Sequence, residues 1–102
     1  MHLVELFLPL ADNDGVRFPF VSYEAVEKEL TERFGGVTAY PRAPARGLWK
    51  SSETIKQQDD LVIYEVMTDY VDGDWWQTYR IKLERIFRQQ KLIVRAHEIK
   101  ML

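Results

Sequence analysis

The sequence predicts an α+β domain in which four strands and two helices follow one another in the order β-α-β-β-α-β. Four segments carry apolar residues at the two-residue spacing of a strand, and two carry them at helical spacing. Glycine, proline and aspartate separate most of these segments, as expected for turns. With 102 residues, the chain has the length of one domain, so we expect a single domain over residues 1–102.

The first half of the chain is predicted to hold two strands and one helix. The first strand covers residues 2–10, and both of its faces are largely apolar. A helix then runs from Tyr23 to Phe34, with Ser22 as its N-cap and a glycine after its last turn. The second strand is predicted over Val37–Tyr40.

Between the second and third strands, Pro41 and Pro44 confine the continuing chain to a sheet edge or an irregular arm. Residues 51–58 have the polar composition of a hairpin tip and its return. The third strand, Leu61–Thr68, has two mostly apolar faces, which is typical of a central strand covered on both sides.

The second helix is predicted to begin at Asp74, which with Gln77 has the spacing of a capping box. Its buried stripe is expected to comprise Trp76, Tyr79, Leu83, Ile86 and Phe87. The last strand is predicted over Leu92–Met101.

This order of elements is that of the split βαβ, or ferredoxin-like, fold. We therefore expect a four-stranded antiparallel sheet in the order 4-1-3-2, with two helices on one face. The first and third strands would lie in the middle of the sheet, and we expect these two to run parallel to each other.

Two helices can cover only one face of this sheet, although its strands are apolar on both. The uncovered face is expected to carry Leu3, Phe7, Ile63, Met67, Ile93 and Ile99. A patch of that size is larger than soluble monomers usually expose. We therefore expect a homodimer with the two sheets packed face to face, since twofold dimers are the commonest assembly.

Four polar residues, Glu5, Glu65, Arg95 and His97, are predicted to lie on the same uncovered face. Because an unpaired buried carboxylate is costly, Arg95 is expected to pair with Glu5 or Glu65. Three interpretations stay open. In the first, the cluster is a structural ion-pair network. In the second, it is a small-ligand site in a cavity between the two sheets, where Arg95 and His97 bind an anion or a carbonyl group. In the third, it is a catalytic centre with Glu65 or His97 as general base.

Several other chemistries are not expected. No cysteine is present, which excludes disulfides and thiolate ligands. The acidic loop over 11–21 does not fit a calcium-binding EF-hand, because Leu10 and Val21 would occupy positions that need oxygen ligands. We therefore expect no metal site and no cofactor. The third strand lacks the basic and aromatic motif of RNA-recognition domains, so no nucleic-acid partner is expected.

The expected location is the cytoplasm, with which the absence of cysteine is compatible. No apolar run is long enough to span a membrane, so no membrane partner is expected.

The segment Phe34–Thr38 (FGGVT), followed by Gly47–Lys50 (GLWK), resembles a family of small bacterial proteins of unknown function. In that family a helix ends on Phe and Gly, a Thr-containing strand follows, and a Gly-x-Trp arm leads into a hairpin. The resemblance spans residues 30–95 and implies a ferredoxin-like fold, but no activity and no catalytic residue. This chain departs from the pattern by inserting Pro-Arg-Ala-Pro before the arm.

The arm adds three candidate ligand-binding residues. Gly47 would let Trp49 fold back as a lid. Arg42 and Arg46 either line the rim of a cavity and favour an anion, or are solvated side chains of an exposed loop. The sequence thus predicts a soluble homodimeric domain that binds a small anionic ligand. One alternative is a small cofactor-free enzyme, an isomerase or monooxygenase of the dimeric α+β barrel type. Another is a protein-interaction module that uses Trp75, Trp76 and the region of Trp49.

Overall fold

The computed structural model describes residues 1–42 and 61–102. These residues form β1 (His2–Pro9), α1 (Phe20–Phe34), β2 (Thr38–Arg42), β3 (Leu61–Thr68), α2 (Gly73–Ile86) and β4 (Val94–Glu98). The α+β class and the order of the elements are confirmed. The predicted hairpin over 51–58 lies outside the described residues.

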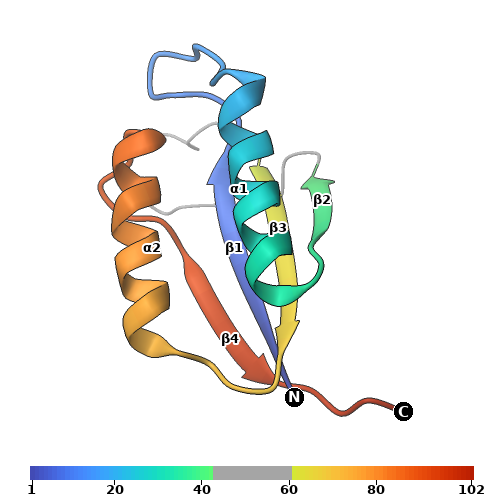
Figure 1. Ribbon diagram of the computed structural model, residues 1–102. Coiled ribbons are helices and arrows are strands. Elements are labelled where there is room, and N and C mark those ends of the chain that lie inside the picture. Colours follow the sequence, from blue (N-terminus) through green and yellow to red (C-terminus); the bar gives the residue numbers. More distant parts are fainter. Residues whose placement is uncertain (43–60) are drawn as a thin grey trace, which may run out of the picture.

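The four strands form one sheet in the order β2-β3-β1-β4, which is the predicted order read from the opposite edge. Both helices lie on the same side of this sheet (Figure 1). All neighbouring strands are antiparallel, so the expectation that the first and third strands run parallel is wrong. The crossover through α1 makes β2 parallel to β1, and β3 lies between them in the opposite direction.

The core fills the space between the helices and the sheet. Alternate residues of the two central strands point into it, namely Val4, Leu6 and Leu8 from β1 and Val62, Tyr64 and Val66 from β3. The helices contribute Tyr23, Val26 and Leu30 from α1 and Trp76, Tyr79 and Leu83 from α2. Phe87, just after α2, is also fully buried. Ile86, predicted to be in the stripe, is instead 42% exposed.

Both helices begin one or more residues earlier than predicted. The N-cap of α1 is Pro19, and Ser22 lies inside the first turn, where its N–H donates to the Pro19 oxygen at 3.0 Å. Proline suits a helix start because its fixed φ is compatible with the first turn and its missing N–H costs nothing there. The N-cap of α2 is Asp72, whose carboxylate accepts from the Trp75 N–H at 3.1 Å, so the prediction of Asp74 is also wrong.

The edge strand β2 and the end of α1 follow the sequence closely. Gly35 has a left-handed φ of 84° and ends α1 as predicted. Among the strands that the structure describes, β2 pairs with β3 alone, and it continues through Pro41, as a proline at a sheet edge allows. The opposite edge strand, β4, is shorter than the predicted Leu92–Met101.

Candidate functional site

The face of the sheet turned away from the helices, here called the open face, carries side chains in rows across the strands. The pairing of the strands places Thr38, Glu65, Glu5 and Arg95 in a central row. The row on one side consists of Met67, Leu3 and His97. The row on the other side consists of Tyr40, Ile63, Phe7 and Ile93. A polar row therefore lies between two mainly apolar rows.

Arg95 is paired with Glu5 in the central row. Its Nε donates to the Glu5 Oε1 at 2.9 Å, and its guanidinium carbon lies 4.8 Å from the centroid of the Phe7 ring. The Glu5 side chain is 13% exposed and that of Arg95 is 62% exposed. An ion pair that is open to water on one side contributes about 1 kcal/mol or less to stability. Its main effect here is to neutralise Glu5.

Glu65 lies directly opposite Glu5 across the β1–β3 pair and is half-buried. Its side chain forms no hydrogen bond or ion pair with any other residue that the structure describes. Like charges at directly opposite positions of a sheet destabilise it, and Arg95 lies on the far side of Glu5. The central row therefore contains one carboxylate that would gain from a positive or hydrogen-bond-donating partner.

A hollow of about 590 Å³ opens beside Glu65. It is lined by Leu3, Met67, Thr38, Tyr40 and the turn that joins α1 to β2. The side chains of Thr38 and Tyr40 are exposed and bring two hydroxyl groups to the hollow. Sequence reasoning missed these two residues. Their two-residue spacing places them on one face of β2, but only the register with β3 shows that this face carries Glu65.

His97 is not among the residues that line this hollow. His97 lies opposite Leu3 at the β4 edge and is exposed. Arg42 pairs with Leu61 at the end of β2. Arg46 and Trp49 lie outside the described residues. Of the seven residues proposed from the sequence, the structure thus brings Glu5, Glu65 and Arg95 into one row, with His97 in the next.

The Trp75–Trp76 pair packs within the domain. The Trp76 ring is stacked on Phe34, with centroids 5.2 Å apart, and the residue is 6% exposed. The half-buried Trp75 is stacked on Tyr79, and the Arg33 guanidinium carbon lies 4.2 Å from the centroid of its ring. This cluster joins the end of α1 to the start of α2, which gives both tryptophans a structural role.

In residues 1–42 and 61–102, no helix is both long enough and apolar enough to cross a membrane. The same residues contain no cluster of three or more His, Cys, Asp or Glu side chains that could hold a metal ion. Comparisons with protein-family models, curated proteins and solved structures found no match to this chain. The resemblance to the small bacterial family therefore stays a prediction.

Proposed function

We propose that this chain is a ferredoxin-like domain that forms a homodimer through its open face and binds a small ligand in the hollow around Glu65. The observation that carries this proposal is the half-buried Glu65 carboxylate, which has no partner among the described residues and lies between two apolar rows. A second sheet packed on this face would bury the rows and close the hollow into a cavity.

Exposed apolar surface supports the dimer. On the open face Met67 is 52% exposed, Ile93 is 56% exposed and Tyr40 is 47% exposed. Covering the exposed half of a large apolar side chain is worth about 1 kcal/mol. Both copies would contribute these residues, together with the half-buried Leu3 and Phe7. The combined gain opposes the entropic cost of association.

The lining of the hollow supports a ligand that donates hydrogen bonds. Glu65 supplies a carboxylate acceptor, Thr38 and Tyr40 supply hydroxyl groups, and Leu3 and Met67 supply apolar contacts. A small amine or a polyol with an apolar part fits this combination, because a carboxylate binds a charged or hydroxyl donor strongly. The anionic ligand predicted from the sequence would instead bind at Arg95 and His97, in competition with Glu5.

A cofactor-free enzyme is the second candidate function, and the same carboxylate favours it. Both oxygens of Glu65 lack a partner among the described residues, so they could accept a proton from a bound substrate. This candidate needs ligand binding first, and therefore shares the hollow with the leading proposal.

The variant Glu65→Gln tests the leading proposal because it keeps the size of the side chain and removes its charge. We expect small amines or polyols to raise the melting temperature of the wild-type protein, and Glu65→Gln to lose this shift. The matched control is Glu24→Gln, at an exposed position on α1. This variant should keep the rise in melting temperature. Light scattering should give twice the monomer mass of 12.1 kDa for all three proteins.

Other results would favour the alternatives. Stabilisation by carboxylates that is lost in Arg95→Gln but kept in Glu65→Gln would support the anionic ligand and contradict the Glu65 site. Ligand binding that survives in Glu65→Gln, with turnover of that ligand by the wild type alone, would support an enzyme. A monomer with no response to any of these compounds would contradict the proposal as a whole.

A further inference from the structure

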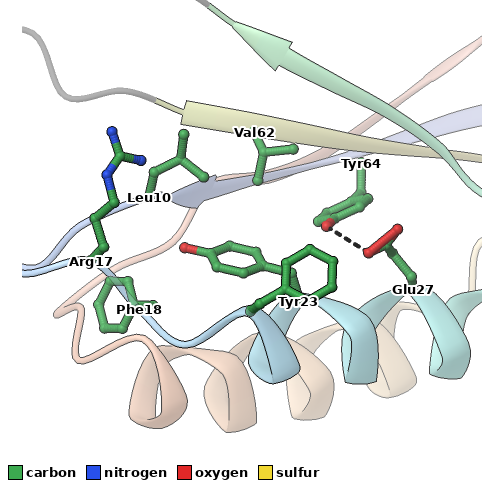
Figure 2. Close-up of a pocket in the computed structure, with 8 residues that line it drawn as sticks. Leu10, Arg17, Phe18, Tyr23, Glu27, Val62 and Tyr64 are labelled. Carbon is green, nitrogen blue, oxygen red and sulfur yellow. Dashed lines mark hydrogen bonds between the residues drawn. The ribbon is translucent and has the colours of Figure 1, made fainter.

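A pocket of about 300 Å³ lies on the opposite side of the sheet from the hollow, where the loop after β1 meets α1 (Figure 2). We call it the α1 pocket. It is lined by Leu10, Arg17, Phe18, Phe20, Tyr23, Glu27, Val62 and Tyr64. We propose that the α1 pocket binds a small aromatic molecule that carries a carboxylate or a similar anionic group.

The walls of the α1 pocket are fixed by contacts within the protein. The Tyr23 hydroxyl donates to the Pro9 oxygen at 2.7 Å, and the Tyr64 hydroxyl donates to the Glu27 Oε2 at 3.3 Å. The rings of Phe18 and Tyr23 each lie 5.2 Å, centroid to centroid, from the buried ring of Phe87. A ligand would therefore meet a largely preformed site, which lowers the entropic cost of binding.

The loop that supplies Arg17 and Phe18 is also held in place. A bridge joins Ala11 to Arg17, and the Phe18 N–H donates to the Leu10 oxygen at 3.3 Å. Inside the loop, the Asp12 carboxylate accepts from two backbone N–H groups. The loop thus has a defined shape that keeps Arg17 and Phe18 at the pocket.

The size and lining of the α1 pocket favour an aromatic ligand. Small-molecule sites begin at about 300 Å³ and are lined mainly by apolar and aromatic side chains. Phe20 lines this pocket although it is 73% exposed, so it offers an accessible aromatic face. Aromatic rings that stack or meet edge to face gain about 0.5–1.5 kcal/mol beyond the area they bury. One or two fused rings would fill the available space.

The charged residues of the α1 pocket determine the charge of the expected ligand and its orientation. Figure 2 shows Arg17 at the loop end of the pocket and Glu27 with Tyr64 at the opposite end. Arg17 lines the pocket together with Tyr23. Burial raises the pKa of Tyr23, and the positive charge of Arg17 opposes this shift. A guanidinium has five N–H donors and can hold a carboxylate while it keeps another contact. Glu27 would repel an anion, so the charged end of the ligand should lie at Arg17.

Nuclear magnetic resonance of the full ¹⁵N-labelled chain tests this proposal with two probes of the same ring system. Indole-3-acetate has the predicted anionic group, and tryptamine carries a positive charge on the same ring. We expect indole-3-acetate to shift the amide signals of residues 10–27 and 62–64 in a saturable manner. Tryptamine should bind at least tenfold more weakly. Equal binding of the two probes, or shifts confined to the open face, would overturn the proposal.

Two exposed positions provide variants that should fold normally. Phe20→Ala should weaken the binding of indole-3-acetate several-fold, whereas Val21→Ala, at a neighbouring position that is 66% exposed, should not. Arg17→Gln should weaken it tenfold or more, since a hydrogen bond to a charged group contributes about 1.5–3 kcal/mol and about 1.4 kcal/mol is tenfold. Glu65→Gln should have no effect, which separates this site from the hollow. If Phe20→Ala and Val21→Ala bind alike, the pocket is not the site.

Discussion

Asp12 shows how one side chain can hold a loop in shape. Its Oδ1 accepts from the N–H groups of Asp14 and Val16, both at 2.9 Å, and its Oδ2 accepts from the Arg88 guanidinium at 3.0 Å. The Asp12 side chain is 13% exposed. From the sequence, the acidic loop over 11–21 could be compared only with the calcium-binding EF-hand motif, and it does not match that motif. The three hydrogen bonds of Asp12 give it a structural role, joining the loop to the end of α2.

We expect Tyr23 to make the folded protein less stable as the pH becomes alkaline. Burial raises the pKa of its hydroxyl to about 12 from a usual value near 10, so the folded state holds the proton more tightly than the unfolded state. Its contribution to stability is therefore complete below about pH 10 and is lost as the pH rises towards 12. Burial also raises the pKa of Tyr64 and of Tyr79, which act in the same direction.

The variant Tyr23→Phe separates this contribution from the others. At pH 8 it should lower the free energy of unfolding by about 1 kcal/mol, because the hydrogen bond to the Pro9 oxygen is lost. Between pH 10 and 12 its stability should fall less steeply than that of the wild type. Tyr70→Phe, at a tyrosine that is 75% exposed, should change neither result. Urea titrations at several pH values measure the free energy of unfolding. If this free energy falls equally steeply with pH in Tyr23→Phe and in the wild type, Tyr23 does not cause the pH dependence.

At the scale of the elements, the sequence predicted strands better than helix starts. The two-residue spacing identified β1 and β3 and divided their side chains correctly between the two faces. The helix starts were wrong because several residues near each start have suitable chemistry. Asp72 and Asp74 are both good capping residues, and only the position of the chain after β3 decides which of them reaches a free N–H.

The two aspartates give a direct test of that assignment. Asp72→Ala should lower the free energy of unfolding by about 1 kcal/mol, since it removes the acceptor for the Trp75 N–H. It also removes a carboxylate that lies 3.8 Å from the Arg33 guanidinium. Asp74→Ala removes only a charge in the first turn and should cost about 0.5 kcal/mol or less. Urea unfolding measures both, and a larger loss for Asp74→Ala would show that the cap is Asp74 after all.

At the scale of the whole molecule, sequence reasoning reached the sheet order but not the sites in full. The order of elements and the handedness of crossovers constrain which strands are neighbours. The hollow and the α1 pocket depend on finer geometry. Thr38 lies next to Glu65 only through the register of an edge strand. Arg17 and Tyr64 line one pocket only because the loop after β1 is bridged back to Ala11 beside the start of α1. Neither juxtaposition is visible in local spacing.

The homodimer is a property of the whole molecule, and a matched pair of isoleucines can locate its interface. Ile93 lies on the open face and is 56% exposed, whereas Ile86 lies at the end of α2 and is 42% exposed. A lysine at position 93 would place a charge inside the proposed interface, where it loses its hydration without a partner. A lysine at position 86 would stay in water.

We therefore expect Ile93→Lys to be a folded monomer and Ile86→Lys to remain a dimer when both are measured by light scattering at micromolar concentration. The melting temperature of the wild type and of Ile86→Lys should rise with protein concentration, because association stabilises only the folded state. The melting temperature of Ile93→Lys should not change with protein concentration. If both variants remain dimers, the chains associate through a different surface, and the apolar rows beside Glu65 must be covered in another way.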